Sequence, residues 1–136
     1  MVIDTSAVLA ILQLELEADE LAHAIEEASE RLISAVSVLE AGIISLSRRG
    51  RGGVQRLESF INTAELEVVA FDGEQCLVAR EAFARYGKGR HRAGLNFWDC
   101  ASYALAATRA LPLLFKGNDF AHTDIIPALA SSGAAR

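Results

Sequence analysis

Four acidic residues follow or precede short apolar segments of the chain, and carboxylates placed in this way could share one chemical task. They are Asp4, Glu40, Asp99 and Asp119. Oxygen ligands of this kind select hard cations such as Mg²⁺ or Mn²⁺, which keep several waters that a substrate phosphate can replace. A cation held in this way can activate water and neutralise charge that develops on phosphorus. The four acids therefore suggest metal-dependent hydrolysis of phosphodiester bonds.

Each acid also has a purely structural explanation. Ser37 and Glu40 have the spacing of a capping box, Asn96 and Asp99 form a close variant, and Asp4 could cap a helix on its own. A helix cap can occur at any helix start, however. These acids follow the first, second and fourth apolar runs or begin the helix that leads to the fourth run, so as a set they favour a common site.

Strands and helices alternate along the chain and must position these acids. Apolar runs of strand length lie at 1–4, 31–35, 66–71 and 112–116, with a short last one at 124–126. Helical periodicity is found at 5–13, 17–30, 37–48, 53–63, 73–86 and 96–110. Strands that alternate with helices form parallel crossovers, so the sequence predicts an α/β fold, a three-layer α/β/α sandwich around a central, mostly parallel sheet. Ligands bind at the carboxyl ends of the strands in such a sheet, where the acids would meet.

Length and composition limit the classes of protein that this chain can belong to. Its 136 residues, of which 51% are hydrophobic, predict a single domain over 1–136 with a frayed tail over 130–136. Two cysteines without a CxxC pair argue against a disulfide framework or a zinc site. The chain has neither an apolar run of membrane-spanning length nor a signal peptide, so we expect no membrane association and a cytoplasmic location.

The formal net charge of −5 argues against a protein that holds polyanions by bulk positive charge. Two segments, 48–56 and 88–92, nevertheless hold more than half of the lysines and arginines. Loops rich in glycine and arginine suit contact with phosphate groups, although they serve equally well as solubilising connectors. Lys116, which lies near the acids, is the better single candidate for contact with a scissile nucleic-acid strand.

Four ordered segments resemble PIN-domain ribonucleases of the VapC toxin type. The segments are Val-Ile-Asp4-Thr-Ser-Ala, Ser-Val-Leu-Glu40-Ala, Asn96-Phe-Trp-Asp99-Cys-Ala-Ser-Tyr-Ala-Leu-Ala and Leu-Leu-Phe-Lys-Gly-Asn-Asp119-Phe. The similarity covers essentially the whole chain. It implies a PIN-like fold and an endoribonuclease that depends on Mg²⁺, with Mn²⁺ as a substitute, and that acts on RNA. It also implies a homodimer and a cognate VapB-type antitoxin that blocks the site.

The resemblance also implies roles for the four acids. Asp4 and Asp99 match the principal metal-binding acids of the family. Glu40 matches a further ligand or a base that orients water, and Asp119 matches a fourth acid of the site. Hydroxyl-bearing residues directly after Asp4 would orient its carboxylate.

Two other classes of function remain open on the sequence alone. A catalytically silent PIN-like module would bind RNA or a protein without cutting it, and its acids would be structural. A phosphatase of the HAD type also begins with an acid after its first strand, but it needs a second Asp two residues later, and Ser6 occupies that place. Metal titration separates a nuclease from the silent module.

Overall fold

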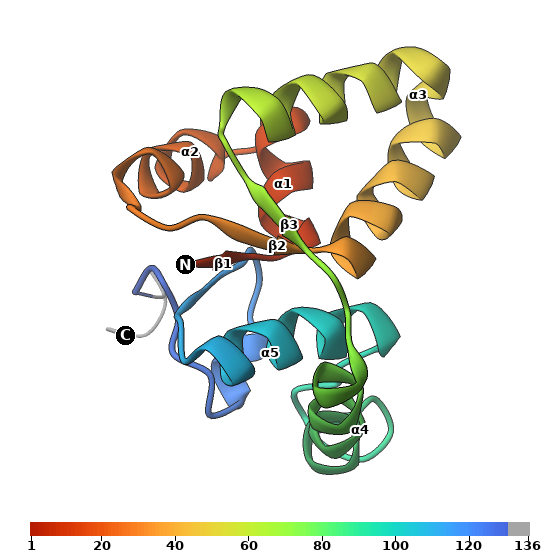
Figure 1. The fold of residues 1–136 in the computed structure, drawn as a ribbon, viewed down its shortest axis with the longest axis vertical. Helices are drawn as coiled ribbons and strands as arrows, with labels where there is room; N and C mark the ends of the chain where they lie inside the picture. The colour runs from red at the N-terminus through yellow and green to blue at the C-terminus, as the bar shows by residue number, and fades with distance from the viewer. Residues whose placement is uncertain (131–136) are drawn as a thin grey trace.

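The computed structural model describes residues 1–130 and shows helices alternating with short strands (Figure 1). The elements are β1 (Val2–Ile3), α1 (Thr5–Leu12), α2 (Ala18–Glu27), β2 (Leu32–Ser34), α3 (Ala35–Thr63), β3 (Glu67–Val69), α4 (Gly73–Tyr86), α5 (Phe97–Arg109), β4 (Leu113–Leu114) and a 3₁₀ turn η1 (Phe120–His122). The tail expected over 130–136 lies, apart from Ala130, outside the described residues.

The four strands form one parallel sheet in the order β3-β2-β1-β4. Helices α1, α2 and α3 cover one face of this sheet, and α4 and α5 cover the other (Figure 1). The three-layer α/β/α sandwich predicted from the sequence is therefore confirmed. Since all four strands run in the same direction, their carboxyl ends lie along one edge of the sheet, which is the edge where the acids were expected.

Adjacent residues of β1, β2 and β4 contribute to different parts of the hydrophobic core, whereas β3 buries only Val69. Val2 and Leu32 are buried in the cluster that α4 and α5 cover. Ile3 and Ile33 are buried in the cluster formed with α1, α2 and α3. This division explains why β1, β2 and β4 have continuous apolar sequences, because successive side chains of a strand point to opposite faces and both faces are covered at these strands.

Helix α3 is broken at Gly50, where the backbone has φ 64° and ψ −156°. Two separate helices, 37–48 and 53–63, were predicted in this region, and the structure joins them through a single non-helical residue (Figure 1). The basic segment 48–56 is therefore not the loop that the sequence suggested. Its arginines lie on helical turns on both sides of the break.

The two arms of α3 approach each other closely at Gly53. A Cβ atom at this position would lie 2.7 Å from the Ser45 carbonyl oxygen and 2.8 Å from the Cβ of Arg49, whereas one at Gly52 would meet nothing within 4 Å. We expect Gly53→Ala to lower the free energy of unfolding by about 1–3 kcal/mol because the arms must separate. Gly52→Ala is the matched control and should raise it by about 0.5 kcal/mol.

Urea unfolding of both glycine variants measures this difference directly. Equal effects of the two substitutions would contradict the close approach of the two arms.

The short last strand predicted at 124–126 is not formed. Instead, an isolated bridge joins Pro127 to Leu113. The Leu113 N–H donates to the Ile126 carbonyl at 2.9 Å, and the Ala128 N–H donates to the Leu113 carbonyl at 2.8 Å. These two hydrogen bonds, made by the residues on either side of Pro127, form an isolated bridge and not a strand.

Cys76 and Cys100 are both free; Cys76 is exposed on α4 and Cys100 is buried on α5. Within residues 1–130, none of the helices combines the length and the apolar character needed to cross a membrane.

Candidate active site

Asp4 lies where β1 ends and caps the N-terminus of α1, with only 3% of its surface exposed. Its Oδ2 accepts hydrogen bonds from the Ser6 N–H at 3.0 Å and the Ser6 hydroxyl at 2.6 Å, and its Oδ1 accepts one from the Ser102 hydroxyl at 2.6 Å. A carboxylate has roughly four lone-pair sites, so one site is left for a cation or a substrate group. The Asp4 carboxylate is thus held in a fixed orientation and still has one free lone-pair site.

A group of hydroxyls holds Asp4 in place and joins the elements around it. The Ser37 and Ser102 hydroxyls lie 3.0 Å apart and connect α3 to α5. The Thr5 hydroxyl donates to the Ser37 carbonyl at 3.3 Å, and the Lys116 N–H donates to the Ser6 hydroxyl at 3.0 Å. The ends of β1 and β4 and the starts of α1 and α3 are therefore linked to α5 through one network.

Ser102 and Ser37 were not among the residues predicted for the site. One signal for Ser102 was present, because it follows Asp99 by three residues and such residues lie on the same side of a helix. For Ser37 the spacing to Glu40 pointed to a helix cap instead. The Ser102 hydroxyl donates to Asp4 and the Ser37 hydroxyl contacts Ser102, so the two add to the orientation that the sequence assigned only to Thr5 and Ser6.

The capping-box explanation fails for Glu40 and holds for Asp99. Helix α3 begins earlier than expected, and Ser34 is its cap, accepting from the Val36 N–H at 3.1 Å. Glu40 consequently has no capping partner. At α5 the box is complete: the Asp99 N–H donates to Asn96 Oδ1 at 2.9 Å, and the Asn96 N–H donates to Asp99 Oδ2 at 3.0 Å. Asp99 therefore helps to cap α5 and is also one of the four candidate site acids.

The other three acids lie close enough to Asp99 for their charges to affect its pKa. Burial raises the pKa of Asp99 to about 7, its capping bond to Asn96 opposes this rise, and the charges of Asp4, Asp119 and Glu40 add to it. Burial also raises the pKa of Glu40; its neighbour Thr5 opposes the rise, and the charge of Asp4 adds to it. Carboxylates that repel one another in this way are stabilised by a bound cation or by protons.

Asp119 occupies the exposed cap position of η1 and makes no side-chain capping bond. Among residues 1–130, no group of three or more His, Cys, Asp or Glu side chains is arranged so as to hold a metal ion. The four acids thus form an open set of oxygen donors and not a closed cage. This arrangement fits Mg²⁺, which is usually held by one or two carboxylates together with waters and substrate phosphates.

The basic residues near the site are arranged differently from the expectation. The Lys116 ammonium pairs with Glu15 and lies 3.4 Å from Glu17 on the turn between α1 and α2. Its role as the contact to a scissile strand would require these ion pairs to open. The second basic segment, 88–92, does lie in a loop, between α4 and α5.

A family model for the PIN domain matches residues 1–126 of the chain. The chain belongs to the PIN-domain family. This PIN domain is 49% identical over 125 residues to Ribonuclease VapC of Mycolicibacterium smegmatis, covering 92% of this chain and 97% of that protein. It is 47% identical over 125 residues to Ribonuclease VapC30 of Mycobacterium tuberculosis, covering 92% and 95% of the two chains. The family resemblance drawn from the four acidic segments is confirmed.

Solved structures show the same fold for this PIN domain. The crystal structure of Mycobacterium tuberculosis VapC20, described as a toxin that cleaves the sarcin–ricin loop, matches with a TM-score of 0.73 at 14% identity and covers 92% of this chain and 95% of that chain. A toxin–antitoxin complex from Klebsiella pneumoniae matches with a TM-score of 0.68 at 18% identity, covering 96% and 95%. At these identities the likeness supports the fold alone.

Proposed function

We propose that this PIN domain is a VapC-type ribonuclease, the toxin of a VapBC toxin–antitoxin system, and that it hydrolyses RNA phosphodiester bonds at the four acids with the aid of Mg²⁺. The observation that carries this proposal is that the charges of Asp4, Asp119 and Glu40 all raise the pKa of Asp99, and that the charge of Asp4 also raises the pKa of Glu40. The similarity to proteins named ribonuclease VapC, at 47–49% identity over 92% of the chain, supports the same activity.

Within this proposal the acids have different tasks. Asp4 and Asp99 hold Mg²⁺, or Mn²⁺ in its place; the cation, when bound, supplies positive charge for the phosphate oxygens and lowers the pKa of a coordinated water. Glu40 has the raised pKa that suits a base, and it accepts a proton from the attacking water or orients that water. Asp119 is the fourth acid. Ser6 and Ser102 keep the Asp4 carboxylate in one orientation.

Removal of the cation tests this function. We expect the purified protein to cleave RNA at millimolar Mg²⁺ or Mn²⁺, to lose cleavage in excess EDTA and to regain it when Mg²⁺ is restored. Labelled RNA separated on a denaturing gel provides the measurement. Cleavage that persists in EDTA would contradict the metal site, and intact RNA combined with no Mg²⁺ binding in calorimetry would favour a catalytically silent module.

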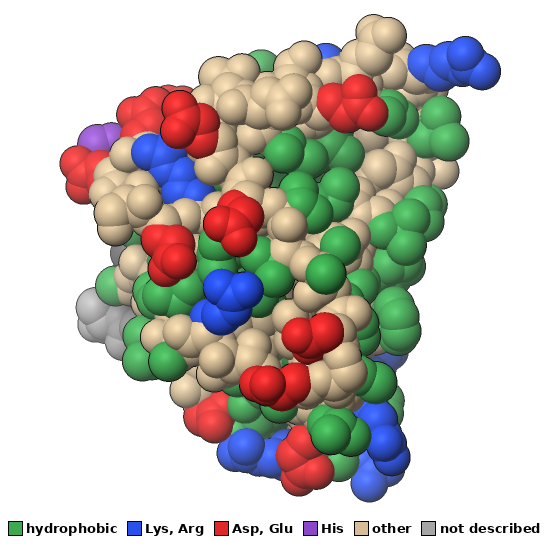
Figure 2. Space-filling model, viewed as in Figure 1, with side chains coloured by type: hydrophobic (Ala, Val, Ile, Leu, Met, Phe, Trp, Pro, Cys, Tyr) green, Lys and Arg blue, Asp and Glu red, His purple; other side chains and the backbone are tan. Residues whose placement is uncertain are grey.

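We also propose a homodimer in the cytoplasm and a VapB-type antitoxin that carries a basic side chain to the acids. Exposed apolar surface supports both contacts. Leu39, Ile43 and Leu46 form a stripe along α3 and are 49–56% exposed, and Phe97 at the start of α5 is 69% exposed. Figure 2 shows hydrophobic side chains along the side of the molecule where α3 lies. Apolar surface of this extent is typical of protein–protein contacts.

A further inference from the structure

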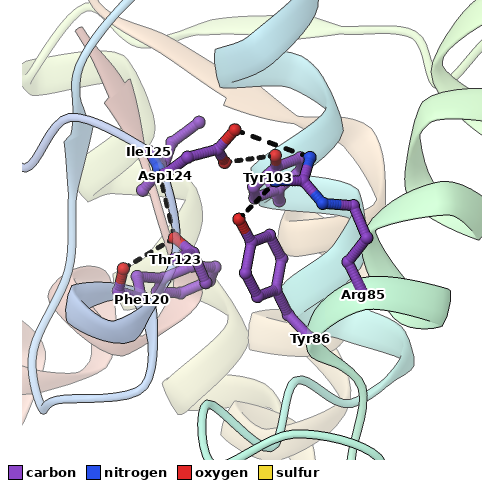
Figure 3. Close-up of polar contacts among 7 residues, drawn as sticks. All are labelled: Arg85, Tyr86, Tyr103, Phe120, Thr123, Asp124 and Ile125. Atoms are coloured by element: carbon purple, nitrogen blue, oxygen red, sulfur yellow. Dashed lines mark hydrogen bonds and ion pairs between the residues drawn. The ribbon is translucent and has the colours of Figure 1, made fainter.

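The segment that carries Asp119 is attached to the rest of the protein at two points. Phe120 is 3% exposed and packs against Phe115 with ring centroids 5.2 Å apart. Asp124, at the other point, accepts a hydrogen bond of 2.5 Å from the Tyr103 hydroxyl (Figure 3). The exposed Asp119 therefore lies at one end of a short segment whose other end is held by α5.

Hydrogen bonds inside this segment connect its two points of attachment. The Thr123 hydroxyl donates to the Phe120 carbonyl at 2.7 Å and accepts from the Ile125 N–H at 3.2 Å (Figure 3). These bonds join residues 120–125 into one unit. Asp124 is thereby connected through Thr123 to Phe120, the residue next to Asp119.

Helix α4 strengthens the attachment at Asp124 through Arg85. The Arg85 guanidinium lies 3.6 Å from the Asp124 carboxylate, donates to the Tyr86 hydroxyl at 2.7 Å and lies over the Tyr86 ring, 4.7 Å from its centroid. Figure 3 shows Arg85 and Tyr103 approaching Asp124 from two different helices. Two elements of the folded core thus hold the same carboxylate.

Tyr103, which holds Asp124, lies on the same helix as the candidate site residue Asp99. It is 5% exposed and follows Asp99 by one helical turn, so the two side chains lie on one face of α5. Ser102, between them, donates to Asp4. Helix α5 therefore carries Asp99. It also orients Asp4 through Ser102, and through Tyr103 it holds the segment that carries Asp119.

We infer that Tyr103 is a positioning residue, whose hydroxyl acts through Asp124 to keep Asp119 within reach of Asp4, Glu40 and Asp99. The inference rests on the proposed function because it places Asp119 in the nuclease site. The physical need is clear, since four carboxylates of like charge repel one another and the exposed one would move outward if its segment were released. Misplacement of a catalytic group by about 1 Å can cost roughly 10²-fold in rate.

A double-mutant cycle of Tyr103→Phe and Asp119→Asn tests the inference. The phenylalanine variant lacks only the hydroxyl, and we expect it to lower kcat and to weaken Mn²⁺ binding in calorimetry, each by about tenfold. In the Asp119→Asn background, Tyr103→Phe should change neither quantity, because it acts through Asp119. Equal losses in both backgrounds, or no loss in either, would overturn the inference.

The same cycle separates this inference from the proposed function. If Asp119→Asn alone leaves cleavage and Mn²⁺ affinity unchanged, Asp119 is not part of the site and the inference fails, while a nuclease built on Asp4 and Asp99 survives. If wild-type protein does not cleave RNA, the proposed function fails, and the Mn²⁺ titrations still decide whether Tyr103 acts through Asp119.

Matched variants exclude a general loss of structure. Thr108→Val removes another α5 hydroxyl, which donates to the Ala104 carbonyl at 2.8 Å, and it should leave kcat and Mn²⁺ affinity unchanged. If Tyr103→Phe unfolds, the contact is tested from Asp124 instead. Asp124→Asn loses the ion pair with Arg85 but keeps an acceptor for the tyrosine hydroxyl, so it should lose less activity than Asp124→Ala, which should show the tenfold loss. Equal activity of these two variants would overturn the inference.

Discussion

Replacement of Asp4 by asparagine should lower the rate of RNA cleavage by about 10³-fold, since a bound cation contributes several kcal/mol to stabilisation of the transition state. The reason is that Asp4 is one of the two proposed metal ligands and that Ser6 and Ser102 fix its side chain in one orientation. The fold should persist in this variant. Asparagine caps helices as well as aspartate does, and its NH₂ group can donate to the rotatable Ser102 hydroxyl.

Cleavage of a fluorophore-labelled RNA at saturating Mg²⁺ measures this effect, and thermal unfolding verifies the fold. Asp72→Asn is the matched control, because Asp72 caps α4 by accepting from the Gln75 N–H at 2.9 Å and was not assigned to the nuclease site. This control should retain full activity. Comparable activity of Asp4→Asn and wild-type protein would remove the basis for the proposed metal site.

Stability of the metal-free protein should fall as the pH rises from about 4 to 7, and Asp99 is the main cause. Its pKa in the folded protein is about 7, against 3.8 as its ordinary value, so the folded state binds the proton more tightly than the unfolded chain. The stabilisation is complete below pH 4 and is lost as the pH rises through 7. A shift of about three units corresponds to about 4 kcal/mol, and partial exposure of the carboxyl reduces this to about 2 kcal/mol.

Urea unfolding of wild-type protein and Asp99→Asn at pH 4.5 and pH 7.5 tests this expectation. The free energy of unfolding of wild-type protein, relative to that of the variant, should be smaller at the higher pH. Mg²⁺ binding should show the reverse dependence, because the cation competes with the proton, so its affinity should rise up to tenfold per pH unit until pH 7. A difference between the two proteins that does not change with pH would contradict the shifted pKa of Asp99.

Most of the fold could be predicted because buried parallel strands and amphipathic helices leave different patterns in the sequence. Val2 and Ile3 have partners on both faces of the sheet, which is why their segment is continuously apolar. The break in α3 could not be located in the same way. Glycine occurs at 42, 50, 52 and 53 of this helix, and only Gly50 adopts a non-helical conformation, a choice that depends on how the two arms pack.

The acids of the candidate site could be predicted because each follows or precedes a strand, and strand ends share an edge in a parallel sheet. Their supporting contacts could not. Ser37 and Ser102 are 65 residues apart and meet only because α3 packs near α5. The pairing of Lys116 with Glu15 depends on the turn between α1 and α2, which brings together residues 101 positions apart. Sequence spacing identifies local neighbours, whereas these contacts are set by tertiary packing.

The position of β1 inside the sheet has a consequence for a nascent chain. β1 lies between β2 and β4, and Val2 pairs with both Leu32 and Leu113. The strand synthesised first therefore gains its second neighbour only after the strand synthesised last has left the ribosome. Asp4 likewise waits for the Ser102 hydroxyl and the segment of Asp119. The four acids therefore cannot assemble until β4 and the segment that carries Asp119 have emerged from the ribosome, so the proposed nuclease site is the last part of the PIN domain to become complete.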